Sequence, residues 1–479
     1  MADQFYRFRR IESLLEYNEL ENQSVFFAAP ENLNDPMEGF RDVYWKGDFV
    51  VWKNFFRHYL LCLERLCSLA LISGEDHPIS ASDMPVFFGE EDFPTDKYRK
   101  QFDAISVRFF ENKKLTLLIK SISNRSSKIR RDELYFYFSL IHGLALEVIF
   151  KSYQDNGLVQ EMDWISSSFD DAIDSLKDNE FFNILESDEF VGIGRNLATH
   201  IFKAQRDIHS QIDLINRHNG NVDDSKKNRN LVFFDFPAEY ISQIENLIFP
   251  EWYTACFMTE CTNSSTWGHY GDNHSGVCLI FDAEVIDDSS YLKLKDLIGL
   301  GSSGKIYGDR NHKFYPINYV SGYGEIDFFR MLGRVPVSKL RSMWYSIDSD
   351  VSECADGIFS DEDGWRNKYW QDFYRDITKK SKDWLYENEY RLILTSNLHD
   401  YSNERDRALT YDFKSLKGII FGIKATIEHK LKIIEIIQRK CIENRRDDFK
   451  FYQAYYCSDG DCIKHKELSL LRLNKSDMK

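Results

Sequence analysis

The chain has 479 residues, of which 43% are hydrophobic and 15% aromatic, so it can bury a large core and is not disordered as a whole. Its length corresponds to about three average domains, or to one large domain with insertions. The formal net charge of −16 argues against a protein that binds nucleic acid over its whole surface, because phosphate contacts need basic groups; only local basic patches would serve.

The number and spacing of the cysteines bear on the cellular compartment and on metal binding. They number nine, and no C-x-x-C pair occurs, so a zinc site has little support and we expect no metal. The opening residues lack the apolar core of a signal peptide, and we expect a cytoplasmic protein with reduced thiols. Three pairs of cysteines share a five-residue step: Cys62/Cys67, Cys256/Cys261 and Cys457/Cys462.

The first 45 residues predict the beginning of an α+β core. Phe5–Arg9 has the composition of a strand, Ile11–Leu20 has helical spacing, and Val25–Ala29 is a second expected strand. The loop that follows contains Asn34 and Asp35, which are typical turn initiators because their side chains bond nearby backbone amides.

Residues 46–230 have a different sequence pattern, with helical periodicity and few glycines or prolines. The longest apolar run begins at Leu134 but is shorter than the ~20 residues of a membrane span, and His142 and Gly143 interrupt it, so we expect a buried core helix and no membrane contact. The polar segment His218–Asn230 predicts an exposed linker. We therefore predict a mainly helical insertion over residues 46–230.

Residues 231–479 predict the remainder of the core. The expected helices are Phe328–Tyr345, Trp365–Lys380 and Ala425–Arg439. The expected strands are Leu231–Phe236, Trp252–Met258, Val277–Asp282, Ile317–Val320, Trp384–Leu394, Leu416–Gly422 and a final strand, Phe451–Tyr456. The glycines at 299–304 match G-x-G-x-x-G, but no strand enters that stretch and no helix leaves it, which argues against a phosphate cradle. The predicted fold class is α+β, with a mixed or antiparallel sheet split by the helical insertion.

The segment W-G-H-Y-G-D-N-H-S-G before the strand Val277–Asp282 is the strongest candidate for a site. We interpret it as a glycine turn that carries an aromatic and histidine cluster on a rigid strand. Tyr270 could stack on a planar ring such as nicotinamide or a base, and His269 could donate to a phosphate or hydroxyl. The alternative is that Trp267 and Tyr270 pack against the strand as core residues.

Three further segments carry charge. Alternation places Glu387, Glu389 and Arg391 on one strand face, where a carboxylate could stabilise a developing cation or accept a proton; the alternative is a solvated face. Arg7 and Arg9 could hold a phosphate or carboxylate, or could face water on an edge strand. The two carboxylates of N-D-P-M-E could ligate a metal, although a turn role suits them as well.

These segments occur in an order that resembles a bacterial family of proteins of unknown function. Its members open with an aromatic-basic strand, a helix and a strand that runs into an asparagine-aspartate-proline loop. They continue with a tryptophan-x-histidine-tyrosine turn and a glycine-led strand, and close with a glutamate-x-glutamate-tyrosine-arginine strand. The matching parts are Tyr6–Arg9, Val25–Ala29, Asn34–Glu38, Trp267–Asp282 and Glu387–Leu392, followed by Gly418–Arg439. The resemblance covers roughly half of the chain.

The same order is also similar to the ADP-ribosyltransferase superfamily, which implies a function. The resemblance implies that Arg7 or His269 holds NAD, that Tyr270 stacks on nicotinamide and that Glu389 is the catalytic carboxylate. We also include Arg9, Trp267 and Arg391 among the residues expected to bind NAD, with Asn34 and Asp35 in the adjoining loop. NAD would then be a substrate, and a protein or nucleic acid could be the acceptor.

Three functions therefore remain in competition. The first is an NAD-consuming ADP-ribosyltransferase-like or NAD glycohydrolase effector, a role that bacterial toxins and phage-defence proteins of this kind fill. The second is a metal-dependent, nucleic-acid-directed enzyme that uses Asp35, Glu38, His269, His274 and Glu389. The third is a non-catalytic sensor or interaction module. The sequence predicts neither a specific substrate nor the oligomeric state.

Overall fold

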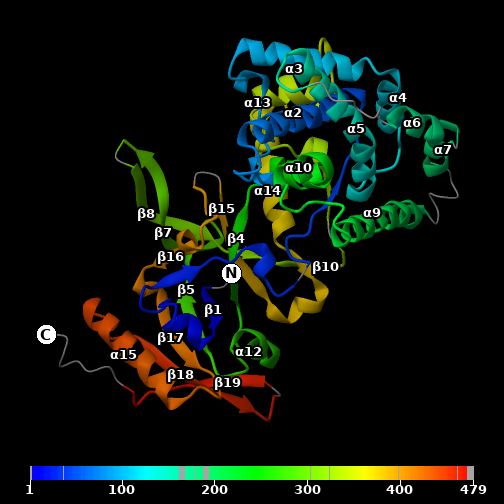
Figure 1. Ribbon diagram of the computed structural model, residues 1–479. Helices are drawn as coiled ribbons and strands as arrows, with labels where there is room; N and C mark the ends of the chain where they lie inside the picture. The colour runs from blue at the N-terminus through cyan, green and yellow to red at the C-terminus, as the bar shows by residue number, and fades with distance from the viewer. Residues whose placement is uncertain are drawn as a thin grey trace. The chain divides into compact units, whose positions relative to one another are not determined.

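A computed structural model describes residues 3–35, 37–160, 168–178, 180–186, 194–302, 304–322, 324–396, 399–460 and 462–471 (Figure 1). The chain forms two compact units. Unit 1 contains residues 1–40, 250–323 and 372–479, and unit 2 contains residues 41–249 and 324–371. The sequence prediction divided the chain at residues 45 and 230; the compact units also assign 41–45, 231–249 and 324–371 to the helical part.

Unit 1 is built on an eight-stranded sheet, which we call sheet A, in the order β19-β18-β17-β5-β1-β4-β15-β9. Its neighbouring strands are antiparallel except for β17 and β18, which are parallel. The strands are β1 Gln4–Arg9, β4 Trp252–Met258, β5 Val277–Asp282, β9 Tyr315–Pro316, β15 Glu389–Thr395, β17 Leu416–Phe421, β18 Lys450–Cys457 and β19 Cys462–Glu467. The predicted mixed sheet and α+β class are confirmed.

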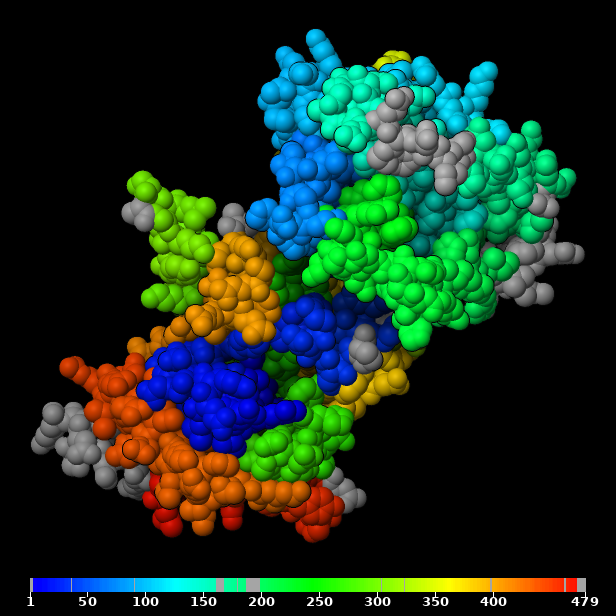
Figure 2. All heavy atoms as spheres, in the orientation of Figure 1, coloured from blue at the N-terminus to red at the C-terminus, as the bar shows by residue number. Residues whose placement is uncertain are grey.

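A second sheet in unit 1 has the order β2-β16-β7-β6, with β8 paired to β7. Its strands are β2 Ser24–Phe26, β6 Glu284–Ile286, β7 Ser289–Gly301, β8 Gly304–Lys313 and β16 Ala408–Tyr411. The long β7–β8 hairpin extends away from the rest of this unit (Figure 2). The glycine-rich stretch around residue 300 therefore forms the end of a hairpin.

The two faces of sheet A carry different residues, because side chains alternate along each strand. On one face, which we call the α15 face, Phe5, Phe257 and Leu279 belong to the main core, together with α1 Ile11–Leu15 and α15 Ile427–Glu443. On the other, the α12 face, Phe8, Met258 and Ile280 form a smaller core with Trp267. Because paired antiparallel residues share a face, Tyr6, Met258 and Glu389 all lie on the α12 face.

Unit 2 is mainly helical, as predicted for the insertion. Its helices include α2 Phe49–Ser73, α3 Asp96–Phe110, α4 Lys113–Ser123, α5 Arg131–Asp155, α6 Phe169–Asp178, α7 Phe181–Glu186, α9 Gly194–His218, α10 Lys227–Asn230, α11 Phe236–Ile244 and α13 Val337–Lys339. Short strand pairs join β3 Asp42–Tyr44 to β11 Glu325–Asp327, and β12 Ser346–Ile347 to β13 Asp350–Val351. Helix α14, Glu362–Ile377, runs from unit 2 into unit 1.

Helix α5 contains the apolar run that begins at Leu134. Of the described helices, α5 alone is long and apolar enough to cross a membrane, and 67% of its most apolar window is buried within the protein. Phe138, Ile141 and Ile149 are fully buried in it. This burial is typical of the core helix of a globular unit, which is what the sequence predicted.

Several predicted elements differ from the structure. Leu231–Phe236 is not a strand: Leu231–Asp235 is a wide helical turn between α10 and α11, where Leu231 and Val232 are buried among helices and tertiary packing overrides strand propensity. The first helix ends at Leu15. The stretch Lys382–Glu387 is a 3₁₀ helix that precedes β15, and β19 follows the strand predicted to be last. Within the predicted helical insertion, residues 187–193 lie outside the described residues, between α7 and α9.

Candidate functional site

The segment W-G-H-Y forms a helix, α12 Ser264–Tyr270, where the sequence predicted a turn. Asn263 caps it, since its side chain accepts a hydrogen bond from the Thr266 amide at 3.1 Å. Trp267 is fully buried; its Nε1 donates to the Cys261 carbonyl at 2.8 Å and its ring meets Phe8 edge-on. Trp267 is therefore a core residue, whereas His269 is exposed and Tyr270 is half-buried at the end of the helix.

The turn that follows α12 is held in an uncommon conformation. Asp272, Asn273 and His274 have positive φ angles of 52°, 50° and 72°. Backbone hydrogen bonds fix the turn against the end of β17: the Lys424 amide donates to the His274 carbonyl, and the Gly422 amide donates to the Gly276 carbonyl, both at 2.9 Å. Such strain persists only where the surroundings enforce it, and here it sets the position at which α12 ends.

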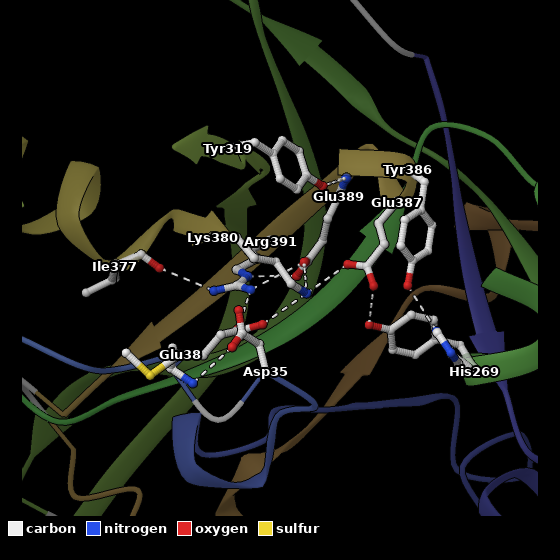
Figure 3. A network of polar contacts seen from close by, with 12 residues as sticks. Asp35, Glu38, His269, Tyr319, Ile377, Lys380, Tyr386, Glu387, Glu389 and Arg391 are labelled. Carbon is white, nitrogen blue, oxygen red and sulfur yellow. Dashed lines mark hydrogen bonds and ion pairs between the residues drawn. The ribbon is translucent and has the colours of Figure 1, made fainter. Parts of the chain in front are cut away.

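Next to α12 lies a group of buried charged side chains (Figure 3). We call this group, made up of Glu38, Lys380, Glu387, Glu389 and Arg391, the ion cluster. Lys380 Nζ lies 2.9 Å from Glu38 Oε1, 2.8 Å from Glu387 Oε2 and 3.0 Å from Glu389 Oε2. Arg391 Nε lies 2.7 Å from Glu389 Oε1, and its Nη2 also pairs with Glu38. None of the five residues is more than 9% exposed. Three carboxylates face two cations, so the fully ionised ion cluster has an excess of one negative charge.

The local folds explain how the ion cluster assembles. Glu389 and Arg391 alternate with Tyr390 and Leu392 on β15 and so point to the α12 face. Asn388, in the left-handed conformation, ends the 3₁₀ helix and brings Glu387 beside Glu389. Lys380 comes from β14 Lys379–Ser381, which pairs in parallel with β10 Asn318–Val320.

The loop with Asn34 and Asp35 completes the ion cluster from the N-terminal part of the chain. Asp35 is buried, its Oδ1 accepts a hydrogen bond from the Met37 amide at 2.9 Å, and its backbone carbonyl accepts one from the Glu38 amide. Its Oδ2 has no hydrogen-bond partner among the described residues. Asn34 is exposed. The loop thus presents Glu38 to the two cations and adds a further buried carboxylate.

The carboxylates of Glu387, which lies just before β15, and Glu389, which begins β15, differ in their pKa values. Burial alone would raise the pKa of Glu389, but the charges of Arg391 and Lys380 outweigh it and lower that pKa from 4.5 to about 2. Burial raises the pKa of Glu387, and the single cation beside it, Lys380, does not fully offset the effect. Glu389 is therefore a fixed anion, whereas Glu387 is the carboxylate suited to exchange a proton.

Aromatic side chains cover the ion cluster on the α12 side. The Tyr270 hydroxyl donates to Glu387 Oε1 at 2.7 Å, and the Tyr386 hydroxyl and His269 Nδ1 are 3.0 Å apart. The Trp384 ring lies 6.0 Å from His269 and 6.1 Å from Tyr386, and Lys380 Nζ lies 4.9 Å from its centroid. We call Tyr270, His269, Trp384 and Tyr386 the aromatic group. Burial raises the pKa of Tyr270, with Glu387 adding to the effect, so this hydroxyl remains a donor.

The structure does not bring Arg7 and Arg9 to this site. Arg7 pairs with Leu279 and lies on the α15 face, where its Nη2 donates to the Phe26 carbonyl at 2.9 Å and its guanidinium lies over Phe257. Burial, with Arg9 adding to it, lowers the pKa of Arg7 to about 10. Arg9 shares that face and pairs with Glu19. The sheet therefore separates both arginines from Glu389 and Tyr270.

Sequence reasoning missed Lys380, assigned Glu38 only to a proposed metal site, and named Glu387 only as a carboxylate on the strand face of Glu389 and Arg391. Lys380 stood at the end of a predicted helix, and nothing in its neighbourhood marks it as buried. Glu387 was recognised as sharing a face with Glu389, and both indeed meet at the Lys380 ammonium group. His274, proposed as a metal ligand, has an Nδ1 atom without a partner among the described residues, and burial, then Lys424, lowers its pKa. Within the described part of the chain, no group of three or more His, Cys, Asp or Glu side chains could hold a metal ion.

Comparison with known proteins gives a partial match. Residues 266–392 match the model of a family described as "Protein of unknown function (DUF2971)". This stretch begins in α12 and ends in β15, so it contains the aromatic group and four members of the ion cluster. No curated protein and no solved structure matches the chain.

Proposed function

We propose that this protein consumes NAD by breaking the bond between nicotinamide and ribose, at the aromatic group above Glu387. The observation that carries the proposal is the 2.7 Å hydrogen bond from the Tyr270 hydroxyl to Glu387, which joins two segments 117 positions apart. An aromatic side chain thus contacts, through its hydroxyl, a carboxylate whose pKa is raised, mainly by burial. Such a pairing is suited to a planar group that carries positive charge.

The charge balance supports this class of ligand. The nicotinamide ring of NAD is a planar cation, and the ion cluster has one more negative group than positive groups. The rings of Tyr270, His269 and Trp384 offer faces and edges for stacking, and the first two belong to the exposed end of α12. A neutral or anionic ring would lack the electrostatic part of this attraction.

The proposed reaction uses Glu387. When the C1′–nitrogen bond breaks, its electron pair leaves with neutral nicotinamide and positive charge develops on the ribose, which a nearby carboxylate stabilises. Water or a nucleophile on a protein or nucleic acid then attacks C1′ and loses a proton, which Glu387 is suited to accept. Because the Glu387 side chain is fully buried, the Tyr270 ring must move when the ligand binds.

The resemblance to ADP-ribosyltransferases implied Glu389 as the catalytic group and Arg7 as a residue that holds NAD. The proposal assigns Glu389 and Arg391 a positioning role, since they fix Lys380 and so orient Glu387. It omits Arg7 and Arg9, because both lie on the α15 face. A role in phage defence or as a toxin would follow from uncontrolled loss of cellular NAD.

The test is nicotinamide release from NAD by the purified full chain, with and without added RNA, DNA and cell lysate. We expect release by the parent protein, a loss of at least about 100-fold in Glu387→Gln, and roughly tenfold in Tyr270→Phe, which loses one hydrogen bond to a charged group. Glu443→Gln, an exposed substitution of the same kind, is the matched control. Release only with one additive would identify a transferase; no release under any condition would refute NAD chemistry.

One observation favours a second function, a non-catalytic interaction module. The charged groups of the ion cluster are buried and paired with one another, as in many structural ion networks. In that case the exposed His269 and the rings beside it would bind a partner without reaction. Wild-type and Glu387→Gln proteins would then bind that partner equally and neither would release nicotinamide.

A further inference from the structure

The five-residue cysteine step occurs three times in the sequence, and the structure gives the three pairs different placements. Cys62 and Cys67 both lie on α2 and are buried, and five residues along a helix turn the two side chains about 140° apart. Cys256 lies on β4, whereas Cys261 lies beyond the end of that strand with its Sγ 3.6 Å from His465 Nδ1. Neither pair consists of residues that face each other directly across two strands.

The third pair is different. Cys457 is the last residue of β18 and Cys462 the first of β19, and the two are direct partners in this antiparallel hairpin. Direct partners have Cα atoms about 4.5–5.5 Å apart, within the range that a disulfide bridges. Both thiols are free and half-buried, so a small oxidant can reach them.

A cation lies beside both sulfur atoms. Lys464 is two residues beyond Cys462 and points to the same face of the hairpin, opposite Tyr455. Its ammonium group contacts Cys457, and this contact, together with the proximity of Cys462, raises the pKa of Lys464. The thiolate is the form of cysteine that attacks a peroxide.

We propose that Cys457 and Cys462 form a reversible disulfide when the protein meets hydrogen peroxide. One thiolate attacks a peroxide oxygen, the O–O bond breaks, and a sulfenic acid forms. The hydroxide that leaves takes up the proton that the thiol has lost and becomes water. The second thiolate attacks that sulfur, the S–S bond forms, and a second water leaves. Two thiols lose two electrons, and the peroxide is reduced by the same two electrons.

The position of the pair links it to α12. The residue after Cys462, Ile463, donates its amide hydrogen to the Thr262 carbonyl at 2.9 Å, and Asn263 then caps α12. Figure 1 shows β19 next to α12. The disulfide therefore restrains the strand that holds the start of the helix with His269 and Tyr270. This inference does not depend on the proposed NAD chemistry.

The experiment treats the full chain with hydrogen peroxide, then alkylates it with iodoacetamide and digests it with trypsin. We expect the peptide from residue 451 to 464 to become lighter by two hydrogen atoms and to resist alkylation, and dithiothreitol to reverse both changes. Cys457→Ser and Cys462→Ser each abolish the change, and Lys464→Ala slows it severalfold.

The buried pair Cys62 and Cys67 is the internal control, and both should stay open to alkylation after denaturation in the oxidised sample. Free alkylation of Cys457 and Cys462 after peroxide treatment would overturn the proposal. So would their conversion to sulfinic acids without a crosslink, or equal oxidation of Cys62 and Cys67, which would indicate general unfolding.

Discussion

Glu387 and Glu389 are two residues apart and bind the same ammonium group, yet their pKa values move in opposite directions. Burial acts on both. Glu389 has the Arg391 guanidinium as well as Lys380, and the two charges outweigh the cost of burial. Glu387 has only Lys380 and the neutral Tyr270 hydroxyl, and these do not outweigh the effect of burial on its pKa. A neighbouring arginine thus separates a structural anion from a carboxylate that can carry a proton.

This difference predicts opposite pH dependences. The lowered pKa of Glu389 means that its ionised form stabilises the fold above pH 4.5, by roughly 3 kcal/mol at neutral pH, and that this contribution is lost as the pH falls toward 2. The raised pKa of Glu387 means that its protonated form is favoured in the folded state, so its contribution is greatest below pH 4.5 and declines as the pH rises.

Glu389→Gln should therefore destabilise the protein at pH 7 and matter less as the pH is lowered, whereas Glu387→Gln should cost little or stabilise at pH 7. Urea unfolding of both variants between pH 4 and 8 measures this. Equal losses at pH 7 would contradict the assigned difference.

Lys380 links all three carboxylates of the ion cluster, and its removal leaves them with one cation. We predict that Lys380→Met lowers the free energy of unfolding by about 3–5 kcal/mol, as expected when one partner of a buried ion network is removed. Adding Glu387→Gln should recover part of the loss. Lys432→Met removes an exposed i,i+4 pair on α15 and should change stability little. A similar small effect at Lys380 would mean that the ion cluster is solvated.

At the scale of elements, the turn after α12 depends on a close approach by Gly422. A Cβ atom at residue 422 would lie 2.3 Å from the His274 carbonyl oxygen and 2.7 Å from that of Gly276. Both are backbone atoms, so neither can move aside without displacing the turn.

Gly422→Ala should therefore destabilise the protein by about 1–3 kcal/mol in thermal or urea unfolding and shift the end of α12, where Tyr270 meets Glu387. The matched control is Gly299→Ala on β7, where an added Cβ atom meets nothing within 4 Å. Equal stability of the two variants would show that the turn adapts without cost.

Strands in which apolar and polar residues alternate, or which are apolar throughout, could be predicted from the sequence. They include β1, β4, β5 and β17. Elements whose character depends on distant packing could not. The W-G-H-Y segment contains a glycine and aromatic residues and gives no helical period, yet the Asn263 cap and the burial of Trp267 make it a helix. Leu231–Asp235 has a strand composition but is buried between helices.

At the scale of the whole molecule, the candidate site draws on segments far apart in sequence. Arg391 pairs with Glu38, which is 353 positions away, and Lys380 lies outside every motif that the sequence analysis identified. The sequence therefore singled out segments that the structure brings close together, including those with Tyr270, His269 and Glu389. It could not predict which face of sheet A each residue occupies, because that depends on strand register; Arg7 was grouped with Glu389 for this reason.

Calorimetric titration with NAD and NADH tests directly whether the aromatic group and Glu387 bind a planar cation. The two ligands differ mainly in the charge and planarity of the nicotinamide ring. We predict that the full chain binds NAD at least about tenfold more tightly than NADH, and that Glu387→Gln removes most of this preference, since a tenfold ratio corresponds to about 1.4 kcal/mol. Equal binding of NAD and NADH, or no binding of NAD at millimolar concentration, would contradict a site for a planar cation at Glu387.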